Sequence, residues 1–166
     1  MLRKLLSMIL ATVMITSYLA MPGIAAGEWT YEAVTYGGET GVAITGYTGA
    51  EVDVVIPPEL DGQPVLGVAE QAFADNTQLN SITLPDSARF VGARAFAGCT
   101  AMRCAILNEG LVELGDGAFA GNSSLNSVIV YDTTTVIGDG VFDGCENVLV
   151  YCFAYSAMQQ YVTEHE

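Results

Sequence analysis

Hydrophobic residues recur along this chain with a fixed 23-residue period. Four phenylalanines set the period: Phe73, Phe96, Phe119 and Phe142. Three further apolar positions keep the same step, occupied by Leu79, Met102, Leu125 and Val148, then Ile82, Ala105, Val128 and Tyr151, then Leu84, Leu107, Val130 and Phe153. A period kept at so many positions indicates a repeat architecture.

The pattern inside one repeat predicts its local structure. Residues 82 and 84 are apolar on either side of Thr83, the alternation of a short half-buried strand. An apolar residue nine positions after Ile82, Val91, and the repeat phenylalanine are expected to form the opposite wall. One such unit cannot bury its own apolar face, whereas stacked units bury a continuous core. The sequence therefore predicts a mostly β solenoid of short parallel strands.

Both ends of the chain depart from the repeat. Residues 1–27 carry Arg3 and Lys4, then a long apolar stretch and small residues, which predicts a secretory signal peptide. Residues 28–166 are expected to form a single domain, with an N-terminal cap over 28–50, repeats over 51–153 and a C-terminal cap over 154–166. Ser156 is a suitable N-cap for a short helix that would shield the last repeat.

The repeat motif resembles a known family. The run Leu79-x-x-Ile82-x-Leu84-Pro85, continued by Val91-Gly92-x-x-Ala95-Phe96-x-x-Cys99, is similar to the BspA-type leucine-rich repeat, also called the Treponema pallidum type. The segment before it resembles that family's N-terminal capping hairpin and longer first repeat. The chain departs from the motif at Asn108 and Tyr131, where the proline is missing. The resemblance implies a leucine-rich-repeat solenoid with a β-hairpin cap.

The charge balance excludes several classes of function. Residues 28–166 hold three arginines against 19 carboxylates, a net of −16. Such a surface repels phosphate backbones and anionic membranes, so we expect no nucleic-acid partner and, after signal cleavage, no membrane partner. The single histidine, His165, stands next to the last residue. No triad or histidine-rich metal site can therefore be built on a rigid element, and we expect no enzyme, cofactor or metal.

Cysteines and carboxylates are the other side chains that could carry chemistry. Cys99 and Cys145 lie two repeats apart in one column, about 10 Å if each repeat adds one strand spacing, which favours free thiols over a disulfide. Asp86, Glu109 and Asp132 share another column. A solvated acidic edge explains this column better than a cation site does.

The outward face of the predicted strands is the candidate binding surface. Side chains one position after the inward residue point away from the core and form a row that we call the outer strip: Val55, Thr83, Ile106, Ile129 and Cys152. The row is largely apolar, and contiguous exposed apolar area often marks an interface. Simple strand propensity of Val, Ile and Thr is the alternative reading.

Three functions remain open at this point. We expect a secreted or cell-surface protein-binding module that contacts a host or bacterial surface protein through the sheet face; adhesion is what the family resemblance implies. The alternative is a structural stalk or a fragment of a larger surface protein. A glycosidase acting through a carboxylate pair is the least supported, because nothing places two carboxylates in a walled pocket.

Overall fold

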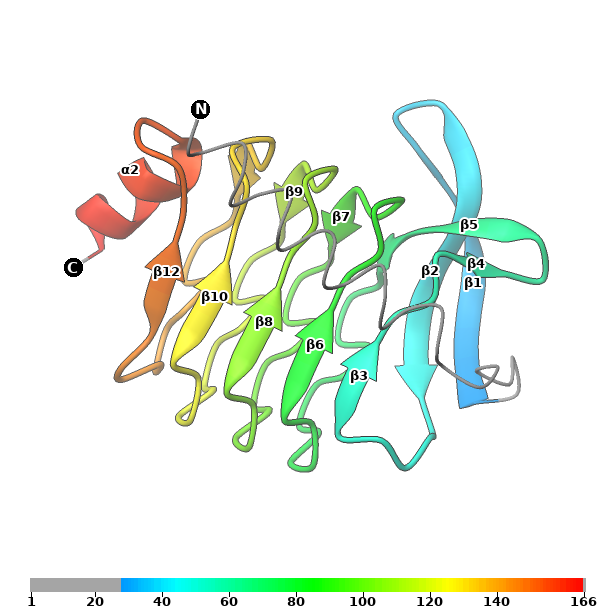
Figure 1. The fold of residues 1–166 in the computed structure, drawn as a ribbon, viewed down its shortest axis with the longest axis horizontal. Coiled ribbons are helices and arrows are strands. Elements are labelled where there is room, and N and C mark those ends of the chain that lie inside the picture. Colours follow the sequence, from blue (N-terminus) through cyan, green and yellow to red (C-terminus); the bar gives the residue numbers. More distant parts are fainter. Residues whose placement is uncertain (1–27, 166) are drawn as a thin grey trace, which may run out of the picture.

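The solenoid winds so that each repeat contributes one strand to each of two sheets. The computed structural model of the chain describes residues 28–165, and the predicted signal peptide, residues 1–27, lies outside the described residues. The turns stack side by side, with a hairpin at one end and a helix at the other (Figure 1). This arrangement confirms the predicted mostly β solenoid with caps of two different kinds.

The first sheet has five parallel strands in the spatial order β12-β10-β8-β6-β3. Each strand is three residues long: β3 (Asp53–Val55), β6 (Ser81–Thr83), β8 (Cys104–Ile106), β10 (Ser127–Ile129) and β12 (Leu149–Tyr151). In Figure 1 the arrows of these strands run in the same direction. These strands occupy the segments in which the sequence alternates. Strand β6 covers residues 81–83, one residue earlier than the span 82–84 that the apolar pair suggests.

The second sheet forms the opposite wall and has seven strands. Its members are β1 (Trp29–Tyr36), β2 (Glu39–Tyr47), β4 (Glu59–Leu60), β5 (Gln63–Val68), β7 (Phe90–Val91), β9 (Glu113–Leu114) and β11 (Val136–Ile137). The strands of the later repeats are two residues long and parallel. The predicted wall residue Val91 is fully buried in this sheet.

A β-hairpin closes the N-terminal end of the core. Strands β1 and β2 pair antiparallel through a turn at Gly37 and Gly38, whose φ angles of 58° and 89° suit glycine. Trp29 on β1 is buried, and its ring lies 6.5 Å from that of Phe73. The hairpin therefore covers the first repeat of the stack.

The repeat phenylalanines form one continuous stack through the core. Ring centroids are 5.2 Å apart for Phe73 and Phe96, 5.2 Å for Phe96 and Phe119, and 5.9 Å for Phe119 and Phe142, with interplanar angles of 24° or less. The backbone N–H of each of the first three donates to a carbonyl of the next repeat at 2.8–2.9 Å. The stack confirms the 23-residue period.

The position three residues after each phenylalanine is used in three ways, and in one of them the buried Asn122 donates from Nδ2 to the sulfur of Met102 at 3.9 Å. Asn76 accepts hydrogen bonds from the backbone N–H groups of Gln78 and Leu79 and closes its own turn. The thiols of Cys99 and Cys145 donate instead to the carbonyl of the phenylalanine one repeat earlier, at 3.1 and 3.2 Å. All four cysteines are free thiols in the structure.

A short helix covers part of the C-terminal end. Helix α2 (Ala157–Glu164) begins after Ser156, whose Oγ accepts from the N–H of Gln159 at 3.1 Å, as the sequence predicts for an N-cap. Met158 is buried, and the hydroxyl of Tyr161 accepts from the N–H of Val141 at 2.8 Å. Among residues 28–165, no helix is long and apolar enough to cross a membrane.

Candidate functional site

The outward face of the five-stranded sheet carries two parallel rows of side chains. Strand geometry sends alternate residues to opposite faces. The middle residue of each strand points inward, and Ile82, Ala105 and Val128 are 0% exposed. The last residue points outward, and strand pairing joins these into one row: Val55, Thr83, Ile106, Ile129 and Tyr151. The first residues form a second row: Asp53, Ser81, Cys104, Ser127 and Leu149.

The position predicted for Cys152 in the outer strip is wrong. Ile129 pairs with Tyr151, so the last member of the row is Tyr151, and Cys152 packs half-buried against the core. The last step is therefore one residue shorter than the steps before it. A shift of one residue exchanges the two faces of a strand, which moves Cys152 inward and Tyr151 outward. From here, the outer strip means Val55, Thr83, Ile106, Ile129 and Tyr151.

One signal in the sequence could have revealed this shorter step. Counting one full repeat onward from Val128 places Tyr151 in the inward slot that Ile82, Ala105 and Val128 occupy. A tyrosine is too large and too polar for a slot that elsewhere holds a fully buried alanine or valine. Shortening the repeat by one residue moves Val150 into that slot and leaves Tyr151 outside.

The outer strip is half-buried along most of its length and opens toward the C-terminal end. Val55, Thr83, Ile106 and Ile129 are of intermediate exposure, and the last three lie on strands that have a neighbouring strand on each side. Tyr151 is 57% exposed and Leu149, in the second row, 61%. The most exposed large apolar side chains of the two rows therefore lie on β12.

Carboxylates border both rows. Asp53 begins the second row, and its carboxylate accepts hydrogen bonds from Asn80 and Ser81 at 2.6 and 2.7 Å. These two bonds lower the pKa of Asp53 below its usual value. Beyond the carboxyl ends of the next three strands lies the predicted acidic column, whose members are all exposed: Asp86, Glu109 and Asp132.

Tyr131 reports the electrostatic effect of this acidic column. The residue lies two positions after the end of β10 and is half-buried. Burial raises the pKa of Tyr131, and the charges of Glu109 and Asp86 raise it further. The rim of the outward face thus carries a negative potential, which favours a partner with positive charge around an apolar centre.

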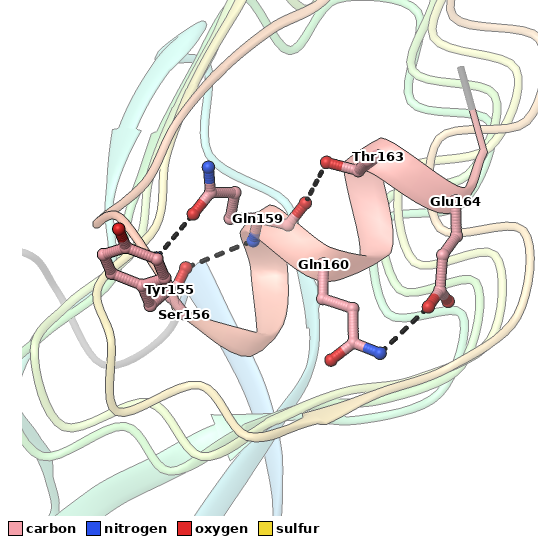
Figure 2. A pocket seen from close by; sticks show the side chains of 6 residues that line it. All are labelled: Tyr155, Ser156, Gln159, Gln160, Thr163 and Glu164. Carbon is pink, nitrogen blue, oxygen red and sulfur yellow. Dashed lines mark hydrogen bonds between the residues drawn. The ribbon is translucent and has the colours of Figure 1, made fainter.

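A shallow hollow beside α2 offers no catalytic arrangement. It is lined by Tyr155, Ser156, Gln159, Gln160, Thr163 and Glu164 (Figure 2). These polar groups bond to one another: Gln160 donates to Glu164 at 2.9 Å, and the Thr163 hydroxyl donates to the carbonyl of Gln159 at 2.9 Å. With one carboxylate in the hollow, a glycosidase mechanism has no acid and base pair there.

Metal chemistry finds no support in the part of the chain that the structure describes. Within residues 28–165, no group of three or more His, Cys, Asp or Glu side chains is placed to hold an ion. The carboxylate of Asp116 accepts from the backbone N–H of Asp139 one repeat later, at 2.9 Å. Part of the acidic surface is therefore structural, because it links successive turns.

Comparison with known proteins agrees with this architecture. The family model described as the BspA type leucine-rich repeat region matches residues 63–162 in six copies, which is more than half of the chain. The chain belongs to the BspA-type leucine-rich repeat family. Leucine-rich repeats of this type are typically a non-enzymatic scaffold for protein interaction. A search of curated proteins finds no match to this chain.

Solved structures of bacterial leucine-rich repeat proteins share the fold. A leucine-rich repeat protein from Bacteroides capillosus is 24% identical, with a TM-score of 0.63 over 77% of this chain and 96% of that one. The Treponema pallidum leucine-rich repeat protein is 28% identical, with a TM-score of 0.56 over 78% and 71%. A leucine-rich cell surface protein from Faecalibacterium prausnitzii is 21% identical, with a TM-score of 0.50 over 75% and 43%.

Proposed function

We propose that this protein is an exported adhesion-type module that binds a protein on a host or bacterial surface through the outer strip. One observation carries the proposal: Ile106, Ile129 and Tyr151 lie on adjacent strands of one outward face as a continuous apolar row. The protein is strongly acidic, and this charge keeps it soluble. The exposed apolar row contributes nothing to solubility, and such rows often mark an interface.

Two further observations support an extracellular setting. Residues 1–27 carry the pattern of an export signal. One structural neighbour is named a leucine-rich cell surface protein, and this chain spans less than half of that protein. Secretion or display on the cell surface is therefore part of the proposal.

Two substitutions in the outer strip test the proposal. Ile106→Asp and Ile129→Asp each place a charge in the middle of the row, which a docked partner would have to desolvate. We expect each to reduce capture of a surface protein from host or bacterial surface extracts at least tenfold. Melting temperature should change little, because both side chains face outward.

Two controls make this experiment decisive. Ile82→Asp adds the same charge at a fully buried neighbour and should unfold the repeat. Thr135→Asp adds it at an exposed position beside the second sheet and should leave capture unchanged. If Ile106→Asp and Ile129→Asp fold and capture partners at full strength, the outer strip is a product of strand propensity and the protein is a structural element of a larger assembly.

A further inference from the structure

The C-terminal edge of the five-stranded sheet is open. Strand β12 is the last strand in the order and pairs with β10 alone. The N–H groups of Leu84, Leu107 and Val130 each donate to a carbonyl of the following repeat, at 2.9–3.1 Å. Cys152 stands in the same column, and no described residue accepts from its N–H. The N–H of Val150, two residues earlier, points to the same side by strand alternation.

Apolar side chains gather along this edge. Within the described residues, four of the six exposed large hydrophobic side chains belong to β12 and the residues after it: Leu149, Tyr151, Phe153 and Tyr155. Val148, Val150 and Cys152 on the inner side are half-buried and end the core. Residues 147–155 contain no charged side chain, so the edge lacks the charges that usually keep a free strand from pairing.

Helix α2 leaves this edge uncovered. It packs against β11 and the ring of Phe142, on the other side of the same end. Its residues Gln159, Gln160 and Glu164 are exposed and polar. In Figure 1, α2 lies above β12 and not along it. A complete further repeat could not stack on a polar helix, whereas the described residues place no strand on the free side of β12.

The negative charge around this edge favours a positively charged partner strand. From Cys104 to the end, the chain contains nine carboxylates and neither lysine nor arginine. A second copy of the chain would bring the same negative charge to the edge and be repelled. A positively charged strand would be attracted, and its lysine stems could lie over Leu149 and Tyr151 while the amines reach the acidic rim.

We propose that β12 binds an extended cationic peptide segment, with alternating apolar and basic residues, as a sixth strand of the sheet. The backbone of the peptide accepts from the N–H groups of Val150 and Cys152, and its apolar side chains cover the half-buried ends of Val148, Val150 and Cys152. This site uses the backbone edge of β12, and Tyr151 is the one residue that it shares with the outer strip. Its failure would therefore leave the proposed function, which rests on Ile106 and Ile129 as well, unaffected.

A synthetic peptide tests the site directly. The probe is the capped heptapeptide Val-Lys-Val-Lys-Val-Lys-Val, titrated into the purified protein and followed by fluorescence anisotropy. We expect saturable binding that weakens at least tenfold between 0.05 and 0.5 M NaCl. The glutamate counterpart, Val-Glu-Val-Glu-Val-Glu-Val, should not bind. Equal binding of both peptides would overturn the choice of a cationic partner.

Matched variants separate strand pairing from charge attraction. Val150→Pro removes one outward N–H and keeps the bonds to β10, while Val150→Ala keeps the N–H and removes most of the side chain. We expect Val150→Pro to weaken the lysine peptide at least tenfold and Val150→Ala less than threefold. A lysine peptide N-methylated at alternate backbone positions should fail to bind the unchanged protein, which gives the same test if Val150→Pro does not fold.

Two further results would overturn the proposal. If Val150→Pro and the N-methylated peptide bind as well as their controls, the contact is charge attraction without strand pairing. If sedimentation shows a dimer that Val150→Pro dissociates, the edge belongs to a second copy of the chain.

Discussion

At the scale of single residues, the phenylalanine stack links the successive repeats through ring contacts. Phe96 and Phe119 are 0% exposed and each contacts a ring on both sides, whereas Phe142 has a repeat on one side and Tyr161 on the other. Stacked aromatic pairs contribute beyond their buried area. Residues in the same column therefore differ in how much they stabilise the molecule.

Truncation of the stack should follow this difference. Phe96→Ala removes a fully enclosed ring and should lower the free energy of unfolding by about 3–5 kcal/mol, the usual cost of such a cavity. Phe142→Ala should cost less, because its ring is half-buried at the end of the stack. Urea denaturation of the two variants measures the difference, and equal costs would show that α2 encloses Phe142 as fully as a repeat would.

Burial also controls the cysteines. Burial, more than any neighbouring charge, raises the pKa of Cys99 to about 11 and raises the pKa of Cys145 in the same direction. A raised pKa keeps the thiol neutral to higher pH, and the thiolate is the species that alkylating reagents attack. At pH 8 the Cys99 thiol is thus both enclosed and almost entirely protonated.

Alkylation should therefore distinguish Cys99 from Cys104, which lies half-buried on the outward face. With iodoacetamide at pH 8 and residue-resolved mass spectrometry, we expect Cys104 to react first and Cys99 to remain unmodified. The thiolate fraction of Cys99 should increase about tenfold for each pH unit up to about 11. Equal rates at pH 8 would mean that the core opens rapidly around Cys99.

At the scale of elements, the sequence predicts the strands that follow the periodic pattern and misses the two-residue strands. The strands of the five-stranded sheet follow from alternation around Ile82 and its equivalents, and strand pairing brings four of the five residues predicted for the outer strip into one row. The two-residue strands β7, β9 and β11 are too short to show alternation. The sequence therefore predicts the apolar residues of the opposite wall but not that they form a β-sheet.

The last repeat shows why the site was predicted less completely than the fold. The position of Cys152 depends on one missing residue before β12, which the regular 23-residue count hides and only the size and polarity of Tyr151 could have indicated. The exposure of Tyr151 depends on the absence of a strand beside β12, which is a property of the assembled sheet. Local pattern determines the face of a residue, but coverage of that face is decided by distant segments.

At the scale of the whole molecule, charge opposes the compact state. The residues from 28 onward carry a net charge of −16, and residues 28–165 contain one salt bridge, between Arg89 and Glu39 at 3.3 Å. Most carboxylates are therefore balanced by solvent and salt. Self-repulsion of this kind destabilises the folded state and weakens as ions screen it.

Thermal stability should therefore rise with ionic strength. Between 0.01 and 0.2 M NaCl at pH 7, where the screening length falls to below about 10 Å, we expect the melting temperature to increase by several degrees. Calorimetry measures the shift, and sucrose at matched osmolality serves as the control for solvent exclusion. A melting temperature that falls with NaCl would show that attractive ion pairs outweigh the repulsion.

The regular step of the Phe96 and Phe119 repeats has a consequence for how such a protein can change during evolution. Each of these repeats makes the same ring contacts and the same backbone bonds to its neighbours. In-frame duplication of one such unit would therefore preserve every kind of contact and disturb neither the hairpin nor α2. Each duplication would lengthen the outward face by one strand spacing, about 4.8 Å. Gene duplication could thus lengthen the proposed binding surface in fixed increments while the fold stays the same.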